Sequence, residues 1–220
     1  MAIFGCMNKS LVGLAGCLGV LLVGALICAG LVAGSYNGLV RRSQAVDQHW
    51  AQVQNVYQRR ADLIPNLVNT VSGAANFEKS TLTQVMEARA SATQVKVTPN
   101  QAPANQAELE KYQQAQGQLT SALGRLLVVV ERYPELKANA NFLNLQAQLE
   151  GTENRISVER GRFNEAVQNY NTALKRFPTV LVAGLFGFQE KPYFIAAAGA
   201  ETPPNVEFNF GAPPAPAAKP

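Results

Sequence analysis

A long run of apolar positions lies near the start of the chain. Residues 10–40 carry no charge, and the 24 residues from Leu11 to Gly34 are all Leu, Val, Ile, Ala, Gly or Cys. A helix rises about 1.5 Å per residue, so this run would measure about 36 Å, enough for a hydrocarbon core of about 30 Å. The pattern predicts a single-pass transmembrane helix over residues 11–35, preceded by a short tail at 1–10.

Two competing interpretations of the run stay open. A cleaved secretory signal usually has an apolar core of about 7 to 15 residues, shorter than the run seen here. Lipid attachment at Cys17 is the second, but Lys9 lies close before Cys17 and the apolar run continues past it. We therefore favour an uncleaved anchor. Lys9 on one side nearly balances Arg41 and Arg42 on the other, so the positive-inside rule leaves the orientation undecided.

Beyond the anchor, apolar positions recur at helical spacing, either at alternating steps of four and three or at steps of seven. The first row contains Val46, Trp50, Val53, Tyr57, Ile64, Leu67 and Val71, with Arg60 as its one exception. Two later rows contain Leu109, Tyr112, Gln116, Leu119, Leu123, Leu126 and Val130, and then Phe142, Leu149, Ile156, Phe163 and Tyr170. With a shorter candidate at Phe77, Leu82 and Val85, these rows predict helices near 36–73, 76–96, 105–132 and 135–176.

Turn signals support these boundaries. Asn105 followed by Glu108 resembles a capping box at the start of the third helix. Pro134 is suited to the first turn of the fourth helix, and Pro178 stops it. Helices with one apolar stripe bury it only by packing together. The sequence therefore predicts an all-α protein, in which the N-terminal transmembrane helix is followed by an elongated antiparallel four-helix bundle over residues 36–178.

Two segments follow the predicted bundle. The segment at 179–200 is apolar but too short to span a membrane, and we expect it to pack on the bundle or on the membrane. A Pro/Ala-rich tail at 201–220 should be disordered. If the four helices alternate in direction, the apolar segment lies at the membrane-proximal end. Four aromatic residues, Phe186, Phe188, Tyr193 and Phe194, then form a candidate membrane-proximal or partner surface.

Local helix rules are broken at three positions. Pro65 lies inside the first helix, where it removes one hydrogen bond and crowds the carbonyl of Ala61, so a kink is expected. Gly117 and Gly124 are seven apart and share one face of the third helix. Each costs about 1 kcal/mol relative to Ala. Close approach of a neighbouring helix is the favoured explanation for both, and a groove for a partner is the alternative.

Charge and composition exclude few functions but disfavour some. The net charge is +4, and the basic residues occur in short pairs rather than in a stripe with interleaved aromatics. Nucleic-acid binding is therefore not expected. The three cysteines all lie within the first 28 residues. A long thiol-free remainder suits an exported compartment.

Catalytic and metal-binding patterns are missing from the sequence. His49 is the one histidine, whereas a carboxylate-bridged two-metal site in a bundle needs two Glu-x-x-His pairs. No phosphate-binding loop or dinucleotide fingerprint occurs. We expect no catalytic residues, no metal, no cofactor and no enzymatic activity. An envelope hydrolase that uses His49 as its base is the least favoured alternative.

Polar residues gather around the proline of the first helix. Asp62, Asn66 and Asn69 follow steps of four and three, which places them on one helix face. They bind a ligand, or they form a buried polar network that stabilises the kink. Together with Arg59, Arg60 and Pro65 they make a candidate interaction or structural motif.

Several ordered motifs resemble the LemA family. They are YQRRADLIPNLVNTV at 57–71, YPELKA at 133–138, QLEGTENRI at 148–156, RFNEAV at 162–167, YN at 170–171 and LFGF at 185–188, with KPYF at 191–194. The resemblance covers residues 36 to about 208. It implies a four-helix bundle carried by an N-terminal membrane segment, with no established enzymatic activity. Tyr36 and Asn37 fit the same pattern. Members often carry a lipid-attachment Cys just before this Tyr-Asn pair, where this chain has Gly34 and Ser35.

We therefore expect a non-enzymatic, membrane-anchored scaffold or adaptor of the bacterial cell envelope. A ligand-sensing or regulatory envelope module is the alternative. The expected partners are the lipid bilayer, membrane or envelope proteins and a second copy of the chain, but not nucleic acid. The lipidated relatives imply a bundle on the outer, periplasmic face of the inner membrane.

Overall fold

A computed structural model describes residues 3–73, 77–95 and 101–195 of the chain. The helices in these ranges are α1 (Ile3–Ser72), α2 (Lys79–Gln94), α3 (Gln106–Val130), α4 (Pro134–Lys137), α5 (Ala140–Lys175) and α6 (Thr179–Phe186). No strand occurs in the described ranges. The all-α expectation is confirmed, and the predicted tail at 201–220 lies outside the described residues.

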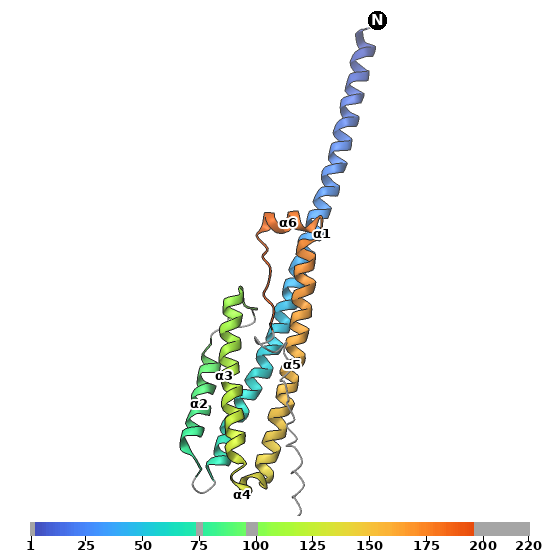
Figure 1. Cartoon of the computed structure of the whole chain (residues 1–220). Helices are drawn as coiled ribbons and strands as arrows, with labels where there is room; N and C mark the ends of the chain where they lie inside the picture. The colour runs from blue at the N-terminus through green and yellow to red at the C-terminus, as the bar shows by residue number, and fades with distance from the viewer. Residues whose placement is uncertain (1–2, 74–76, 96–100, 196–220) are drawn as a thin grey trace, which may run out of the picture.

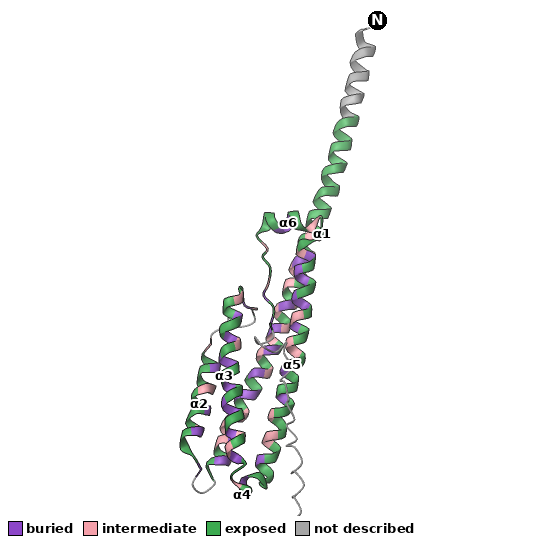
Figure 2. Cartoon of the chain, viewed as in Figure 1, coloured by how far each residue is buried: buried purple, intermediate pink, exposed green. Residues whose placement is uncertain are grey.

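Helix α1 joins the apolar run to the bundle without a break. It is 70 residues long, and its residues 16–34 are exposed along the part that projects beyond the bundle (Figure 2). Among the described helices, this one is long and apolar enough to cross a membrane. An N-terminal apolar helix of this kind suggests membrane anchoring. The predicted anchor and the first predicted bundle helix thus belong to one continuous helix.

The bundle is elongated and antiparallel (Figure 1). Helix α1 runs away from the N-terminus, α2 returns, α3 runs out again, and α5 returns along α1. Helix α6 lies across the end of the bundle from which α1 projects, and it contacts both α1 and α5. The segment after the fourth bundle helix therefore lies at the membrane-proximal end, as the alternating directions predict.

The rows read from the sequence form the core. All eight positions of the first row are buried, from Trp50 at 0% exposed to Tyr57 at 6%, and Arg60 is 2% exposed. All seven positions of the row on α3 are buried too. Two clusters result, one centred on Trp50 toward the membrane-proximal end and one around Leu67 and Leu126. Figure 2 shows buried residues recurring along α1, α2, α3 and α5.

The fourth predicted helix is shorter than expected. A continuous helix over 135–176 is wrong, because α4 ends at Lys137 and α5 begins at Ala140. The side chain of Asn139 accepts hydrogen bonds from the backbone N–H groups of Asn141 and Phe142, so it caps a new helix instead of continuing the old one.

The preferred explanation for the two α3 glycines is also wrong. Gly117 and Gly124 are exposed. A Cβ atom built at either position would meet no other described atom within 4 Å. Neither glycine is therefore needed for close helix packing. Gly117 instead lies at the rim of two surface hollows, which keeps the alternative of a groove open.

Candidate functional site

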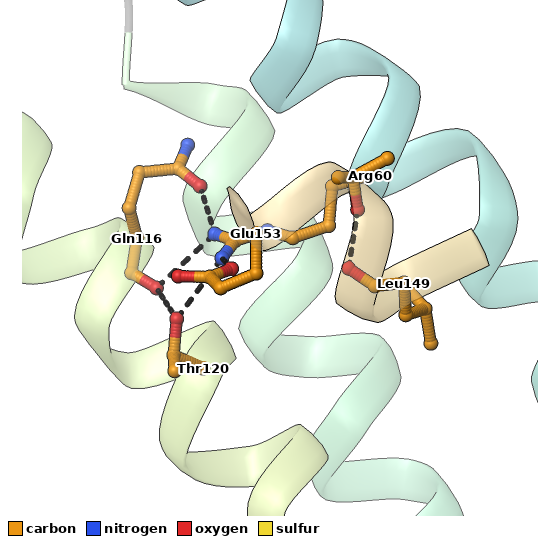
Figure 3. Close-up of polar contacts among 6 residues, drawn as sticks. Arg60, Gln116, Thr120, Leu149 and Glu153 are labelled. Atoms are coloured by element: carbon orange, nitrogen blue, oxygen red, sulfur yellow. Dashed lines mark hydrogen bonds and ion pairs between the residues drawn. The ribbon is translucent and has the colours of Figure 1, made fainter. Parts of the chain in front are cut away.

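A buried arginine lies at the centre of the bundle. Arg60 Nη1 donates to Thr120 Oγ1 at 3.0 Å and to Glu153 Oε2 at 2.9 Å. Arg60 Nη2 donates to Gln116 Oε1 at 2.6 Å and to the Gln116 carbonyl at 3.3 Å. Figure 3 shows these side chains converging from α1, α3 and α5. The odd position in the first apolar row is therefore the residue that joins three helices.

The cluster of Arg60, Gln116, Thr120 and Glu153, here called the Arg60 cluster, extends to a fourth helix. Gln116 Nε2 donates to the Ala92 carbonyl on α2 at 3.3 Å. Within the described chain, Arg60 Nε is buried without a hydrogen-bond partner. The Glu153 side chain is 53% exposed, so the ion pair opens to solvent on one side.

Two tyrosines lie against the Arg60 cluster. The guanidinium carbon of Arg60 lies 5.1 Å from the ring centre of Tyr57, a cation–π geometry. Tyr57 in turn meets Tyr112 edge-on at 5.4 Å. Burial raises the pKa of Tyr112. Burial also raises the pKa of Tyr57, and this effect outweighs the positive charges of Arg160 and Arg60, which lower it. Both phenols therefore remain neutral at physiological pH.

A surface cavity of about 460 Å³ opens beside the cluster. Its lining includes Tyr57, Arg60, Glu153 and Arg160, together with amide side chains of α3. The guanidinium groups of Arg60 and Arg160 and the carboxylates of Glu110 and Glu153 line it, so the cavity offers charges of both signs to a small polar ligand. Sequence reasoning singled out Arg60 but not its partners, because residues 93 positions apart leave no shared local pattern.

The remaining residues of the predicted motif lie elsewhere. Asp62, Asn66 and Asn69 are exposed on α1, so the prediction that they form a buried polar network is wrong. Asp62 Oδ1 accepts from Gln58 Nε2 at 2.7 Å on the same helix. Arg59 is exposed as well. Of this motif, only Arg60 reaches the interior, because the core-facing row continues through it.

Pro65 has its own partner in the structure. It lies within α1, and proline has no N–H to donate to the Ala61 carbonyl. Arg89 Nε of α2 donates to that carbonyl at 2.8 Å. The predicted kink stays a prediction, but the carbonyl that Pro65 leaves without its helical donor is satisfied by a neighbouring helix.

An extended segment at 188–195 runs back from α6 along the bundle (Figure 1). Two asparagines of α5, seven positions apart, pair with its backbone. Asn171 exchanges hydrogen bonds of 2.9 and 3.0 Å with Lys191, and Asn164 exchanges bonds of 3.0 and 2.9 Å with Phe194. Lys191 Nζ also lies 2.9 Å from Asp47 Oδ1. These anchors were missed, although two asparagines on one helical face were a usable signal.

Of the four predicted surface aromatics, one is buried in the core and three lie at or near the surface. Phe194 is buried and stacks on Trp50 at 6.0 Å, so its assignment to a surface is wrong. Tyr193 is 37% exposed. Phe186 and Phe188 lie at the membrane-proximal end, where their rings are 4.9 and 5.6 Å from the ring of Tyr36.

His49, the candidate base, lies on a different face. It lines a surface cavity of about 590 Å³ with Arg42, Arg162, Glu165 and Thr172. No serine or cysteine is among the described residues that line this cavity. Across the described residues, no group of three or more His, Cys, Asp or Glu side chains is placed to hold a metal ion.

Comparisons with known proteins agree with the resemblance. The model of the LemA family matches residues 49–208. Magnetosome protein MamQ of Magnetospirillum gryphiswaldense is 33% identical over 89 residues, 40% of this chain and 33% of that protein. Magnetosome protein MamQ 2 of Paramagnetospirillum magneticum is 26% identical over 186 residues, 76% of this chain and 67% of that protein.

Protein LemA of Metamycoplasma hominis is 24% identical over 150 residues, 68% of this chain and 64% of that protein. The chain thus spans between a third and two thirds of the length of these relatives. Because the family model covers most of the bundle, including the Arg60 cluster, Arg89 and the segment at 188–195, the chain belongs to the LemA family.

Proposed function

We propose that this protein is a non-enzymatic scaffold or adaptor of the bacterial cell envelope, anchored in the membrane by α1. The observation that carries the proposal is the continuity of α1 from the apolar run into the bundle core. A helix without an interruption transmits the position and tilt of the anchor to the bundle. The elongated bundle then offers side surfaces to other membrane or envelope proteins, or to a second copy of itself.

We place the bundle on the outer face of the inner membrane. The absence of cysteine from the sequence after Cys28 supports an exported location, since thiols are avoided where they would be oxidised. The resemblance to lipidated family members points the same way. We transfer no magnetosome role from the relatives named as magnetosome proteins to this chain.

The test is cross-linking in living cells, followed by purification of the full chain in mild detergent. We expect one or more membrane proteins, or a second copy, to be recovered reproducibly. The matched control carries residues 1–35 fused to an unrelated soluble domain, which keeps the anchor and removes the bundle. Recovery of neither a partner nor an oligomer above this control would contradict the adaptor function.

A ligand-sensing role is the second candidate, and the cavity beside the Arg60 cluster favours it. Arg160 lines this cavity and would bind an anionic group of a small ligand beside the carboxylates of Glu110 and Glu153. Titration with inorganic phosphate and with citrate, followed by thermal unfolding, tests the role. Stabilisation that disappears in Arg160→Gln but persists in the control Arg59→Gln supports sensing. Equal stabilisation of Arg160→Gln and Arg59→Gln by these anions would contradict the sensing role.

The hydrolase alternative depends on His49. We expect a His49→Ala variant to match the natural chain in every envelope phenotype. Loss of function in this variant, at unchanged protein level, would reopen the alternative.

A further inference from the structure

Helix α6 lacks the polar outer face of an ordinary surface helix. Its sequence is TVLVAGLF, and the whole stretch 177–189 carries no charge. A helix that is apolar all round is normally buried on every side. Here the bundle covers only one side, so the other side requires a different partner.

The two sides of α6 follow from its burial. Val182 and Ala183 are buried against the bundle, and the ring of Phe186 leans on Tyr36. On the opposite side, Leu181 is 66% exposed and Leu185 is 78% exposed. Together with Phe177 and Val180, which are also exposed, these residues form what we call the outer face of α6.

The position of α6 along α1 indicates what covers this face. Tyr36, which α6 contacts, lies two residues beyond Gly34, the end of the apolar run. At a rise of about 1.5 Å per residue, the contact lies only about 3 Å beyond that end. If the run spans the hydrocarbon, α6 lies at the boundary between the acyl chains and the headgroups. Figure 1 shows α6 crossing α1 rather than running along it, as a helix in the plane of a membrane surface would.

We propose that the outer face of α6 inserts into the interfacial layer of the same bilayer that α1 spans. The bundle is then held at two points, by the anchor through the bilayer and by α6 on its surface. A helix of eight residues is about 12 Å long and cannot span, but it can lie at this depth. Arg41, Arg42 and Arg176 are exposed just below it, where they meet anionic headgroups.

Depth-dependent quenching in the full chain tests this proposal. Cys6, Cys17 and Cys28 are replaced by Ala, and an environment-sensitive fluorophore is attached through Leu185→Cys. The matched control is Val128→Cys on α3, which is also apolar and is 71% exposed. Each protein is reconstituted in vesicles of phosphatidylethanolamine and phosphatidylglycerol, with and without lipids that carry a spin label on the acyl chain. Trp50 fluorescence and circular dichroism verify the fold.

We expect blue-shifted emission from the probe at position 185 and strong quenching by the spin-labelled lipid, with neither effect at position 128. Equal, unquenched emission from both positions in folded protein overturns the proposal. A blue shift at 185 without lipid quenching also overturns it, because protein then covers the face. A second probe at Leu181→Cys gives the same decision if the first variant misfolds. The result does not depend on whether the chain acts as an adaptor.

Discussion

Arg89 Nε donates a hydrogen bond of 2.8 Å to the carbonyl oxygen of Ala61. That oxygen is the one whose helical donor is missing, because residue 65 is a proline. The two observations are one feature: a gap in the hydrogen bonding of α1 is filled by α2. The proline therefore leaves an acceptor on α1 to which α2 binds.

A double-mutant cycle measures this coupling. Arg89→Ala should lower the free energy of unfolding by about 1–2 kcal/mol, because it leaves the Ala61 carbonyl without a donor. In a Pro65→Ala background the backbone N–H of residue 65 takes over, and the same change should cost much less. Thermal unfolding of the full chain in detergent supplies the four values. The exposed Arg125→Ala should change stability by less than about 0.5 kcal/mol, and equal costs of Arg89→Ala in both backgrounds would refute the coupling.

The Arg60 cluster should respond asymmetrically to mutation. Arg60→Ala removes the group that satisfies Gln116 and Thr120, and we expect a loss of about 2–4 kcal/mol. Glu153→Gln removes a charge from a side chain that is half in solvent, and should cost at most about 1 kcal/mol. Denaturant unfolding compares the two. A loss for Glu153→Gln that approaches the loss for Arg60→Ala would show that the ion pair, and not the buried amide contacts, holds the cluster together.

Much of this fold could be predicted because helical packing leaves a periodic record. The row from Val46 to Val71 predicted which face of α1 is buried. Its one polar member, Arg60, marked the position of the buried polar cluster. The N-cap at Asn105 was also predicted correctly, since Asn105 Oδ1 accepts from the backbone N–H of Glu108 at 2.9 Å. In each case the signal lies within one helix.

The rest depends on contacts between distant segments. No local pattern pairs Arg89 with Ala61, or Asn164 with Phe194, because an extended segment docks by its backbone and carries no periodicity. The break before α5 was missed because Ala138 and Ala140 are strong helix formers, and the capping side chain of Asn139 outweighs them. Asp62, Asn66 and Asn69 shared a face, but their spacing alone did not show that this face points to solvent.

The exposed glycines of α3 should be replaceable. Gly124→Ala adds a methyl group that meets no described atom within 4 Å, and it restricts the unfolded chain. We expect a gain of about 0.5–1 kcal/mol in the free energy of unfolding. Thermal unfolding checks the value. A loss of stability would mean that a helix not seen here, such as one from a partner or a second copy, packs on this face.

The segment at 188–195 should loosen when its asparagine anchors are removed. Asn171→Ala deletes both hydrogen bonds to Lys191, and we expect faster amide hydrogen exchange across the segment. Asn169→Ala, an exposed change on the same helix, serves as the control. Unchanged exchange in Asn171→Ala would show that the packing of Phe194 alone holds the segment in place.

Alkaline pH should unfold the protein through its buried tyrosines. The pKa of Tyr57 and of Tyr112 is raised in the fold, so each phenol stays neutral where the unfolded chain ionises. Their contribution to stability is complete below pH of about 10 and falls as the pH rises above it. Tyr112→Phe should reduce the decrease in stability with rising pH, whereas Tyr193→Phe, at an exposed position, should leave that decrease unchanged. Unfolding midpoints measured across alkaline pH decide between the two.

The adaptor proposal depends most directly on which side of the membrane the bundle occupies. The decisive measurement is labelling of Val128→Cys, in a chain without Cys6, Cys17 and Cys28, by a membrane-impermeant maleimide in cells with an intact inner membrane. We predict labelling from outside, to the same extent before and after that membrane is disrupted. Labelling only after disruption would place the bundle in the cytoplasm and contradict an envelope adaptor.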